Sequence, residues 1–180
     1  RRIFPFCSPT CPCMKLAVVC TGAGCPVVRR PRKEAELIAD EPPFEKSFNI
    51  SGGDFVNAGE VASKVKKILQ GLGISAKVIR RATIATYEAE MNVVWYARQG
   101  TLTLSVTPDV LNIKITDEGN GIENVEMAMK EGYSTASEEI REMGFGAGMG
   151  LPNIKRNSDE FYIASVVGQG TVLDITIRRQ

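Results

Sequence analysis

The succession of hydrophobic patterns between Phe44 and Ile177 constrains the fold more than any other feature of the sequence. Alternating apolar residues predict strands, and apolar residues three and four positions apart predict helices. In chain order the predicted elements are a strand at 44–50, a helix through 61–69, a helix at 75–98, strands at 101–107 and 110–116, a short helix at 125–130, a helix from about 151, and strands at 161–167 and 171–177. This order predicts an α+β fold, a two-layer sandwich with the helices on one face of a mostly antiparallel sheet.

Residue types at the ends and on the faces of the two longer helices refine this prediction. Asp54 follows the turn after the first strand and is a candidate N-cap for the first helix, which Gly71 and Gly73 end. On the second helix, six residues at helical spacing are predicted to form the core stripe: Val78, Ala82, Ala85, Ala89, Val93 and Tyr96. Glu90 and Arg98 point away from this stripe, and we expect both to be solvated.

Composition limits the function classes. The formal net charge of +1 gives no electrostatic reason to expect a nucleic-acid partner or an anionic membrane surface. The sequence has no histidine, which excludes a Ser-His-Asp or Cys-His device, a His-ligated zinc site and a phospho-accepting histidine in this chain. Any general base is therefore expected to be a carboxylate or a less usual group.

Residues 1–43 are rich in Pro, Cys and Arg and poor in periodicity. They contain all five cysteines, Cys7, Cys11, Cys13, Cys20 and Cys25. The cysteine spacings match neither zinc-ribbon pairs nor ferredoxin patterns. We expect a poorly ordered extension, with a metal or iron–sulfur site and a redox sensor as the alternatives. Since the pattern becomes regular from Phe44, we expect 44–180 to be a separate domain. It has no cysteine and is therefore built without disulfides, as expected for a reducing cytoplasm.

A glycine run from Gly144 to Gly150 has glycine at every second position and is followed by Leu151 and Pro152. This density of glycine is typical of backbone that takes positive φ angles or lies against a ligand. A helix is predicted to begin directly afterwards, and its free N–H groups would suit a phosphate. Taken alone, the run also fits a flexible surface loop.

Two polar motifs precede the glycine run. Glu88 and Asn92 are four residues apart, so they stack on one flank of the second helix at the rim of the core. Asp117-x-Gly119-x-Gly121 lies where a strand is expected to end, and its aspartate could accept a hydrogen bond from an exocyclic amine while the glycines admit a flat ring. Taken singly, the first motif also fits a polar helix edge and the second a turn. Neither the P-loop nor the Rossmann glycine pattern occurs.

The order and spacing of these motifs, with Gly170-Thr171 near the end, resemble the ATP-binding domain shared by gyrase-type ATPases, histidine kinases, a heat-shock chaperone family and mismatch-repair ATPases. The segments Glu131 to Thr135, Gly150 to Arg156 and Asp159 to Phe161 narrow the resemblance to the anti-sigma-factor serine/threonine kinases, particularly the small switch kinases of bacterial stress signalling. The resemblance covers about 44–177 and implies a Bergerat-type ATP-binding fold.

The resemblance also implies a role for each motif. Glu88 would be the general base, and Asn92 would bind Mg²⁺. Asp117 would bind the adenine amino group, supported by the hydroxyl of Thr171. Further nucleotide contacts would come from the glycine motifs and the helix that follows them: Gly119, Gly121, Gly146, Gly148, Gly150, Leu151 and Lys155. Residues 132–143 would form a mobile lid over the triphosphate.

Some charged and hydroxyl residues near the lid have two interpretations. Arg141 could pair with the γ-phosphate or be a solvated residue, and Lys155 and Arg156 could steer phosphate or form a solvated face. For Ser134 and Thr135, helix capping is the preferred interpretation over phosphorylation.

The sequence thus predicts a cytoplasmic Mg·ATP-dependent serine/threonine protein kinase that phosphorylates a STAS-type antagonist protein in a partner-switching system. The alternative is a non-catalytic ATP-binding module that docks a sigma factor or another regulator, with a redox link through the N-terminal cysteines as a variant. We expect no direct nucleic-acid partner and no membrane, and the resemblance is consistent with a homodimer.

Overall fold

The computed structural model describes residues 43–136, 138, 141 and 146–179, and the fold refers to these residues. They form an antiparallel five-stranded sheet in the order β1-β2-β3-β5-β4. The strands are β1 (Phe44–Ser51), β2 (Ala97–Val106), β3 (Val110–Gly119), β4 (Glu160–Val166) and β5 (Gly170–Arg178). The helices are α1 (Glu60–Gly71), α2 (Ala76–Tyr96), α3 (Val125–Ala128) and α5 (Gly150–Arg156).

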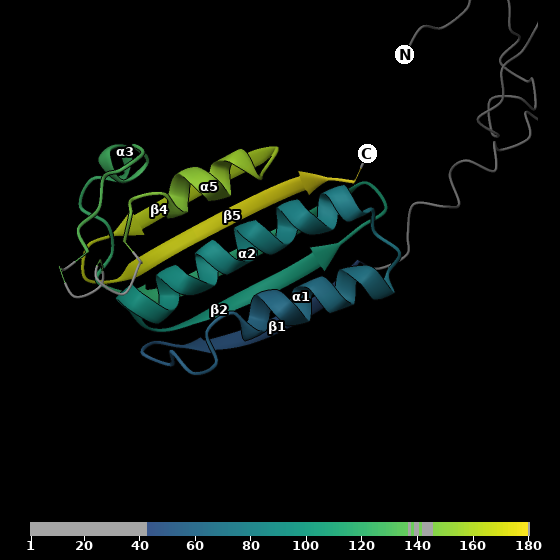
Figure 1. Ribbon diagram of the computed structural model, residues 1–180, viewed down its shortest axis with the longest axis horizontal. Helices are drawn as coiled ribbons and strands as arrows, with labels where there is room; N and C mark the ends of the chain where they lie inside the picture. The colour runs from purple at the N-terminus through teal and green to yellow at the C-terminus, as the bar shows by residue number, and fades with distance from the viewer. Residues whose placement is uncertain (1–42, 137, 139–140, 142–145, 180) are drawn as a thin grey trace, which may run out of the picture. The chain divides into compact units, whose positions relative to one another are not determined.

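Helices α1, α2 and α5 cover one face of the sheet, and α2 lies between the other two (Figure 1). The predicted α+β two-layer sandwich is confirmed. Both predicted hairpins, β2 with β3 and β4 with β5, are also confirmed by their antiparallel pairing. Since α2 is flanked by a helix on each side, residues on its two edges face different neighbours.

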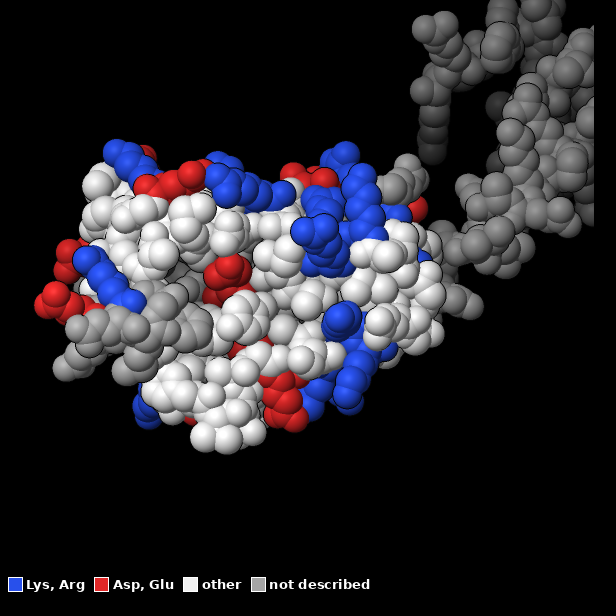
Figure 2. All heavy atoms as spheres, viewed as in Figure 1, with Lys and Arg blue, Asp and Glu red and all other residues white. Residues whose placement is uncertain are grey.

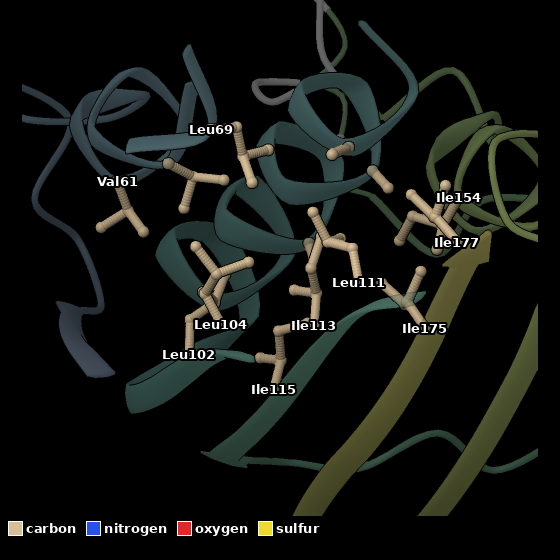
Figure 3. Packing of buried hydrophobic residues seen from close by; sticks show 14 of the residues in the cluster. Val61, Leu69, Leu102, Leu104, Leu111, Ile113, Ile115, Ile154, Ile175 and Ile177 are labelled. Atoms are coloured by element: carbon tan, nitrogen blue, oxygen red, sulfur yellow. The ribbon is translucent and has the colours of Figure 1, made fainter. Parts of the chain in front are cut away.

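The core fills the space between the helices and the sheet (Figure 3). Every second residue of the central strands points to the helices, because side chains alternate between the two faces of a strand. These strand residues are all buried: Leu102, Leu104, Leu111, Ile113, Ile115, Ile175 and Ile177. Val61 and Leu69 of α1 and Ile154 of α5 meet them from the helical layer. Burying each such side chain contributes roughly 1.5–3 kcal/mol, so this layer of contacts holds the helices in register with the sheet.

The start of α1 differs from its prediction. Asp54 is not the N-cap, because the helix begins only at Glu60, after an N-cap glycine, Gly59. The Asp54 carboxylate instead accepts hydrogen bonds from the main-chain N–H of Asn57 at 3.2 Å and from its side-chain amide at 2.9 Å. The carboxylate that was expected to cap the helix is therefore hydrogen-bonded within the local turn.

Two further expectations around the end of α2 are wrong. Tyr96 is 43% exposed and lies outside the core, because α2 ends there and the chain enters β2. Asp117 lies inside a strand rather than after one, because β2 begins early enough to pair with the last residues of β3: Gly100 is opposite Asp117, and Ala97 is opposite Gly119.

Predictions for residues 1–42, including the five cysteines, and for Gly144 fall outside the described residues. The division of the chain near residue 43 therefore stays a prediction. Within the part of the chain that the structure describes, no helix combines the length and apolar character needed to span a bilayer.

Candidate functional site

Glu88 and Asn92 lie one turn apart on α2 and are half-buried. The side-chain amide of Asn153, on α5, donates a hydrogen bond of 2.8 Å to Glu88 Oε1. At Gly150, the first residue of α5, an added Cβ would stand 3.4 Å from Asn92 Oδ1 and 3.6 Å from Glu88 Oε2. Glu88 and Asn92, which the sequence predicted as site residues, thus lie beside Gly150 at the end of the glycine run. We call Glu88, Asn92, Gly150 and Asn153 the Glu88 cluster.

Asp117 forms a second polar centre on β3. Its Oδ1 accepts main-chain hydrogen bonds from Gly119 at 2.9 Å and from Thr171 at 3.2 Å. Burial raises the pKa of the Asp117 carboxyl, and these two hydrogen bonds oppose the rise. Among the described residues, none donates to Oδ2. The carboxylate is therefore held by one oxygen, and the other is without a donor from the described residues.

The β4–β5 hairpin closes against Asp117. Gly170 has a φ of +123°, and a Cβ there would collide with the main-chain carbonyl of Asp117, so this approach requires glycine. The hydroxyls of Thr171 and Ser165 are 2.9 Å apart. Ser165 Oγ also accepts the N–H of Ile122 at 2.8 Å. Ser165 therefore ties the loop after β3 to the hairpin that carries Thr171.

The two centres lie along one edge of α2. Glu88, Asn92 and Tyr96 follow each other at four-residue intervals, and a Cβ on Gly119 would stand 2.8 Å from the Tyr96 carbonyl. From Glu88 to Tyr96 the helix rises about 12 Å. The Glu88 cluster and Asp117 are thus arranged at the two ends of this stretch of α2.

The described part of the glycine run is anchored to the segment that precedes it. Gly146 and Gly148 have φ of 74° and 71°. The N–H of Gly132 donates to the carbonyl of Gly148 at 3.1 Å, and a Cβ on Gly148 would overlap the backbone of Gly132 and Tyr133. The helix α5 has only seven residues, so its dipole is weak. If an anion binds at its start, side chains and loop N–H groups contribute more to the binding free energy than the sequence suggested.

The other predicted site residues on α5 have surroundings of their own. Leu151 packs against the hydrophobic core. Lys155 and Arg156 are exposed in the last turn of α5, about 7–9 Å along the helix from Gly150. Arg156 is hydrogen-bonded to Glu131. The assignment of Lys155 to nucleotide binding stays a prediction.

Residues near the rim have mainly structural contacts. Gly121 has a φ of 71° and lies so close to Val166 that a Cβ would overlap the backbone there. The Ser134 hydroxyl accepts the N–H of Ala136 at 3.1 Å, a local turn contact. Arg141 donates to the main-chain carbonyl of Ser134 at 3.2 Å.

A pocket of about 820 Å³ opens beside Glu88 on the α1 side of α2. One wall is formed by 56–60 and the first turns of α1, including Lys66, and the other by Thr83, Ile84, Tyr87 and Glu88. Glu88 therefore lies between α5, which contributes Gly150 and Asn153, and this pocket. Figure 2 shows Lys and Arg side chains gathered where α1 ends and α2 begins, a region whose exposed cations are Lys66, Lys67, Lys77 and Arg80.

Three site residues were missed from the sequence. Asn153 carries no motif of its own, although it follows the glycine run directly. Ser165 could have been found, because a hairpin centred on Gly168 pairs it with Thr171. Glu90 was expected to be solvated, but it is only 2% exposed. No local pattern marks Glu90, because its partners lie at the start of α1.

The family of the chain follows from comparison with known proteins. A family model described as "Histidine kinase-like ATPase domain" matches residues 54–177, which include the Glu88 cluster and Asp117. The chain belongs to this family. Membership implies that it binds ATP, and the resemblance inferred from the sequence is confirmed.

Individual relatives narrow the comparison. The chain is 34% identical to "Serine/threonine-protein kinase RsbT" of Bacillus subtilis (strain 168) over 122 residues, which are 66% of this chain and 84% of that protein. It is 30% identical to the "Anti-sigma F factor" of Caldanaerobacter subterraneus subsp. tengcongensis over 101 residues, 56% of this chain and 63% of that protein. An anti-sigma F factor of Thermoanaerobacter sp. (strain X514) is 29% identical over the same length. The chain thus spans less than two thirds of the anti-sigma F factors. The roles of individual residues remain predictions.

Proposed function

We propose that this chain is a cytoplasmic, Mg²⁺-dependent serine/threonine protein kinase that uses ATP to phosphorylate a STAS-type antagonist protein. The kinase activity in the name of one relative and the anti-sigma names of others support this class. The observation that carries the proposal is the position of Glu88, which lies beside the start of α5 at Gly150 and also lines an open pocket. A base at such a boundary can serve a nucleotide on one side and a protein hydroxyl on the other.

Glu88 has the hydrogen-bonding state that a general base needs. Its Oε1 accepts a hydrogen bond from the Asn153 amide, which orients the carboxylate. None of the described residues donates to Oε2. As the acceptor hydroxyl oxygen bonds to the γ-phosphorus, its proton passes to Glu88, and ADP leaves with the oxygen of the broken bond. Asn153 is therefore a positioning residue in this proposal.

Asp117 suits the adenine amino group. Its Oδ1 is occupied by main-chain donors, so Oδ2 remains to accept from the exocyclic amine. Gly119 and Gly170 bring backbone within contact of the carboxylate where larger residues would collide. The fit rests on a half-buried acceptor with one unsatisfied oxygen, which matches a single N–H donor on a flat ring.

Asn92 is the residue that would hold Mg²⁺. Its amide faces the N-terminal end of α5 beside Gly150, and an amide oxygen is a suitable ligand for a hard cation that retains several waters. The bound cation would supply neutralisation of the charge on the phosphates. Glu88, one turn earlier on the same helix, lies close enough to act on a hydroxyl brought to that place.

The surface beside the pocket favours an acidic partner. The exposed cations Lys66, Lys67, Lys77 and Arg80 lie on α1 and α2, and Lys66 also lines the pocket. Opposite charges steer association and fix orientation more than they add affinity. An acceptor protein with acidic residues around its serine or threonine would present that hydroxyl to Glu88 from this side.

A transfer assay tests the proposal. Purified chain, Mg²⁺ and γ-labelled ATP are incubated with STAS-domain proteins from the same genome, and label on serine or threonine is expected. Glu88→Ala is expected to lower the transfer rate by about 10²–10⁴-fold, the range for a lost general base, with ATP affinity retained. Glu45→Ala, at an exposed site on β1, is the matched control.

The outcomes separate the two functions. Transfer that depends on Glu88 supports the kinase. ATP binding without transfer, with partner regulation insensitive to Glu88→Ala, supports a non-catalytic ATP-binding module instead. Absence of ATP binding contradicts both.

A further inference from the structure

Glu90 is a buried carboxylate that the proposed chemistry does not use. It is 2% exposed, and both of its oxygens accept main-chain hydrogen bonds from the start of α1. Oε1 accepts from Gly59 at 3.0 Å and from Val61 at 3.1 Å, and Oε2 accepts from Ala62 at 2.9 Å. The contacts join residues about thirty positions apart in sequence and connect α2 directly to α1.

The first turn of α1 has no cap of its own. Helices leave their first N–H groups without intrahelical partners, and a side chain at the N-cap usually accepts from one of them. Gly59 occupies this position with a φ of 89° and has no side chain to offer. Asp54, the nearest upstream carboxylate, is engaged with Asn57. Glu90 supplies the missing acceptor from the neighbouring helix, and its negative charge also suits the positive end of the helix dipole.

The segment that Glu90 holds is a wall of the pocket beside Glu88. Gly59, Glu60, Ala62 and Ser63 all line that pocket. The packing is close, because a Cβ on Gly59 would lie 3.3 Å from the ring of Tyr87, on the opposite wall. Displacement of the first turn of α1 would therefore change the width of the pocket directly.

We propose that Glu90 is a positioning residue for phosphotransfer, which fixes the wall of the pocket where the acceptor protein docks beside Glu88. This inference rests on the proposed function. It assigns Glu90 to recognition of the protein substrate, not to the nucleotide, because Asp117 and its partners belong to β3 and β5 and share no hydrogen bond with Glu90.

The arrangement requires two acceptor oxygens. In Glu90→Gln the shape is preserved, but one acceptor is replaced by an NH₂ group, which has no lone pair for a main-chain N–H. Either the N–H of Ala62 or those of Gly59 and Val61 then lose their partner inside a buried site. The first turn of α1 is expected to open more often in this variant while the rest of the fold stays intact.

The kinetic test separates recognition from chemistry. For Glu90→Gln we expect KM for the acceptor protein to rise about tenfold, with kcat and the Kd for ATP changed by less than about threefold, the pattern of a lost binding contribution. Glu118→Gln, at an exposed site on β3, is the matched control. An unchanged KM, or an equal loss of ATP affinity, would overturn the proposal.

A second variant approaches the same wall without altering Glu90. Gly59→Ala places a side chain on a left-handed residue against Tyr87 and is expected to produce the same selective rise in KM. If Gly59→Ala raised KM for ATP instead, the wall would not belong to the acceptor side, and the proposal would fail.

Amide hydrogen exchange tests the anchor without any activity. In Glu90→Gln the amides of Gly59, Val61 and Ala62 are expected to exchange at least about tenfold faster, while that of Leu69, in the last turn of α1, keeps its rate. Unchanged exchange overturns the assignment of Glu90 alone. Faster exchange together with no transfer by the wild-type chain overturns the proposed function and, with it, the kinetic role of Glu90, although the anchor stands.

Discussion

Glu88 and Glu90 are the same residue type, two positions apart on one helix, yet their surroundings differ in every respect that matters for chemistry. Glu88 is half-buried between α5 and a pocket and accepts one hydrogen bond from a side chain. Glu90 is buried and accepts three from main-chain N–H groups. Residues two apart on a helix point about 200° apart, so one carboxylate is hydrogen-bonded to α5 and the other to the start of α1.

The difference shows what decides whether a carboxylate can react. Glu90 has both oxygens occupied by main-chain donors at a helix N-terminus, so neither oxygen is left for a reacting group. Glu88 keeps one oxygen without a donor among the described residues, so it can accept a proton without breaking its contact with Asn153. The carboxylate of Glu90, with both oxygens hydrogen-bonded, stabilises the structure, whereas the carboxylate of Glu88 has one oxygen available for a reaction.

Removal of Glu90 should have the largest effect on folding. Glu90→Ala leaves three N–H groups at the start of α1 without acceptors, two of them buried and one part-buried, and we expect the free energy of unfolding to fall by about 3 kcal/mol. Glu88→Ala should change it by less than about 1 kcal/mol, because one half-buried hydrogen bond is lost. Urea denaturation of both variants measures this. Equal losses would mean that the two carboxylates do not differ as described.

Asp117 combines features of the two glutamates, since one oxygen is held by main-chain donors and the other is open. In Asp117→Asn an amide NH₂ replaces one acceptor, and the adenine amino group then meets a donor. We expect ATP to bind about 10–100-fold more weakly, or about 1.4–2.7 kcal/mol, with thermal stability not reduced because a half-buried charge is removed. Isothermal titration calorimetry measures the affinity, and an unchanged affinity would place the base elsewhere.

The pH dependence of ATP affinity follows from the same residue. Burial raises the pKa of the Asp117 carboxyl, and only the ionised form accepts from the adenine amine on Oδ2. Affinity should therefore be full above the raised pKa and fall as the pH drops through it, at a higher pH than an ordinary aspartate with a pKa of about 3.9 would give. Titrations on wild type and Asp117→Asn check this, since the variant should lack that part of the pH dependence.

Asp159 should have the smallest effect, because its partners are near the surface. It pairs with Arg81 at 3.0 Å and accepts the N–H of Arg178 at 2.7 Å. The hydrogen bond from Arg81 lowers its pKa, so its contribution to stability is present above the unfolded-state pKa and is lost as the pH falls through the folded-state pKa. Asp159→Asn should cost about 0.2–1 kcal/mol at pH 7, and less at high salt. A loss as large as that of Glu90→Ala would mean that burial does not determine how much each carboxylate contributes to stability.

The sequence predicted the layers and the hairpins well, because they depend on local periodicity. Alternation in the strands and the turn residues between them predict the two hairpins, β2 with β3 and β4 with β5, without tertiary information. The strand order of the sheet was not predicted, because it depends on the pairing of β1 with β2 and of β3 with β5. The approach of Glu88, Asn92 and the glycine run was inferred from their order along the chain and a resemblance, and the structure brings Gly150 to both side chains.

The roles of Glu90 and Asn153 could not be predicted, because each depends on a contact between elements distant in sequence. The angle of Glu90 on an isolated helix predicts solvent exposure, since it carries no information that α1 packs on that side. Asp54 was predicted to be the N-cap only because it lies close to α1 in sequence. In the structure its carboxylate is hydrogen-bonded to Asn57 instead. Local patterns predict which face of a helix is apolar but not which polar groups a neighbouring element leaves unpaired.

The difference between Glu88 and Glu90 is tested most directly by single-turnover phosphotransfer with ATP and the acceptor protein both saturating. Under these conditions docking no longer limits the rate, so Glu90→Gln should transfer at nearly the wild-type rate. Glu88→Gln should be slower by about 10²–10⁴-fold. Comparable slowing in both variants, or none in Glu88→Gln, would contradict the assignment of chemistry to one carboxylate and positioning to the other.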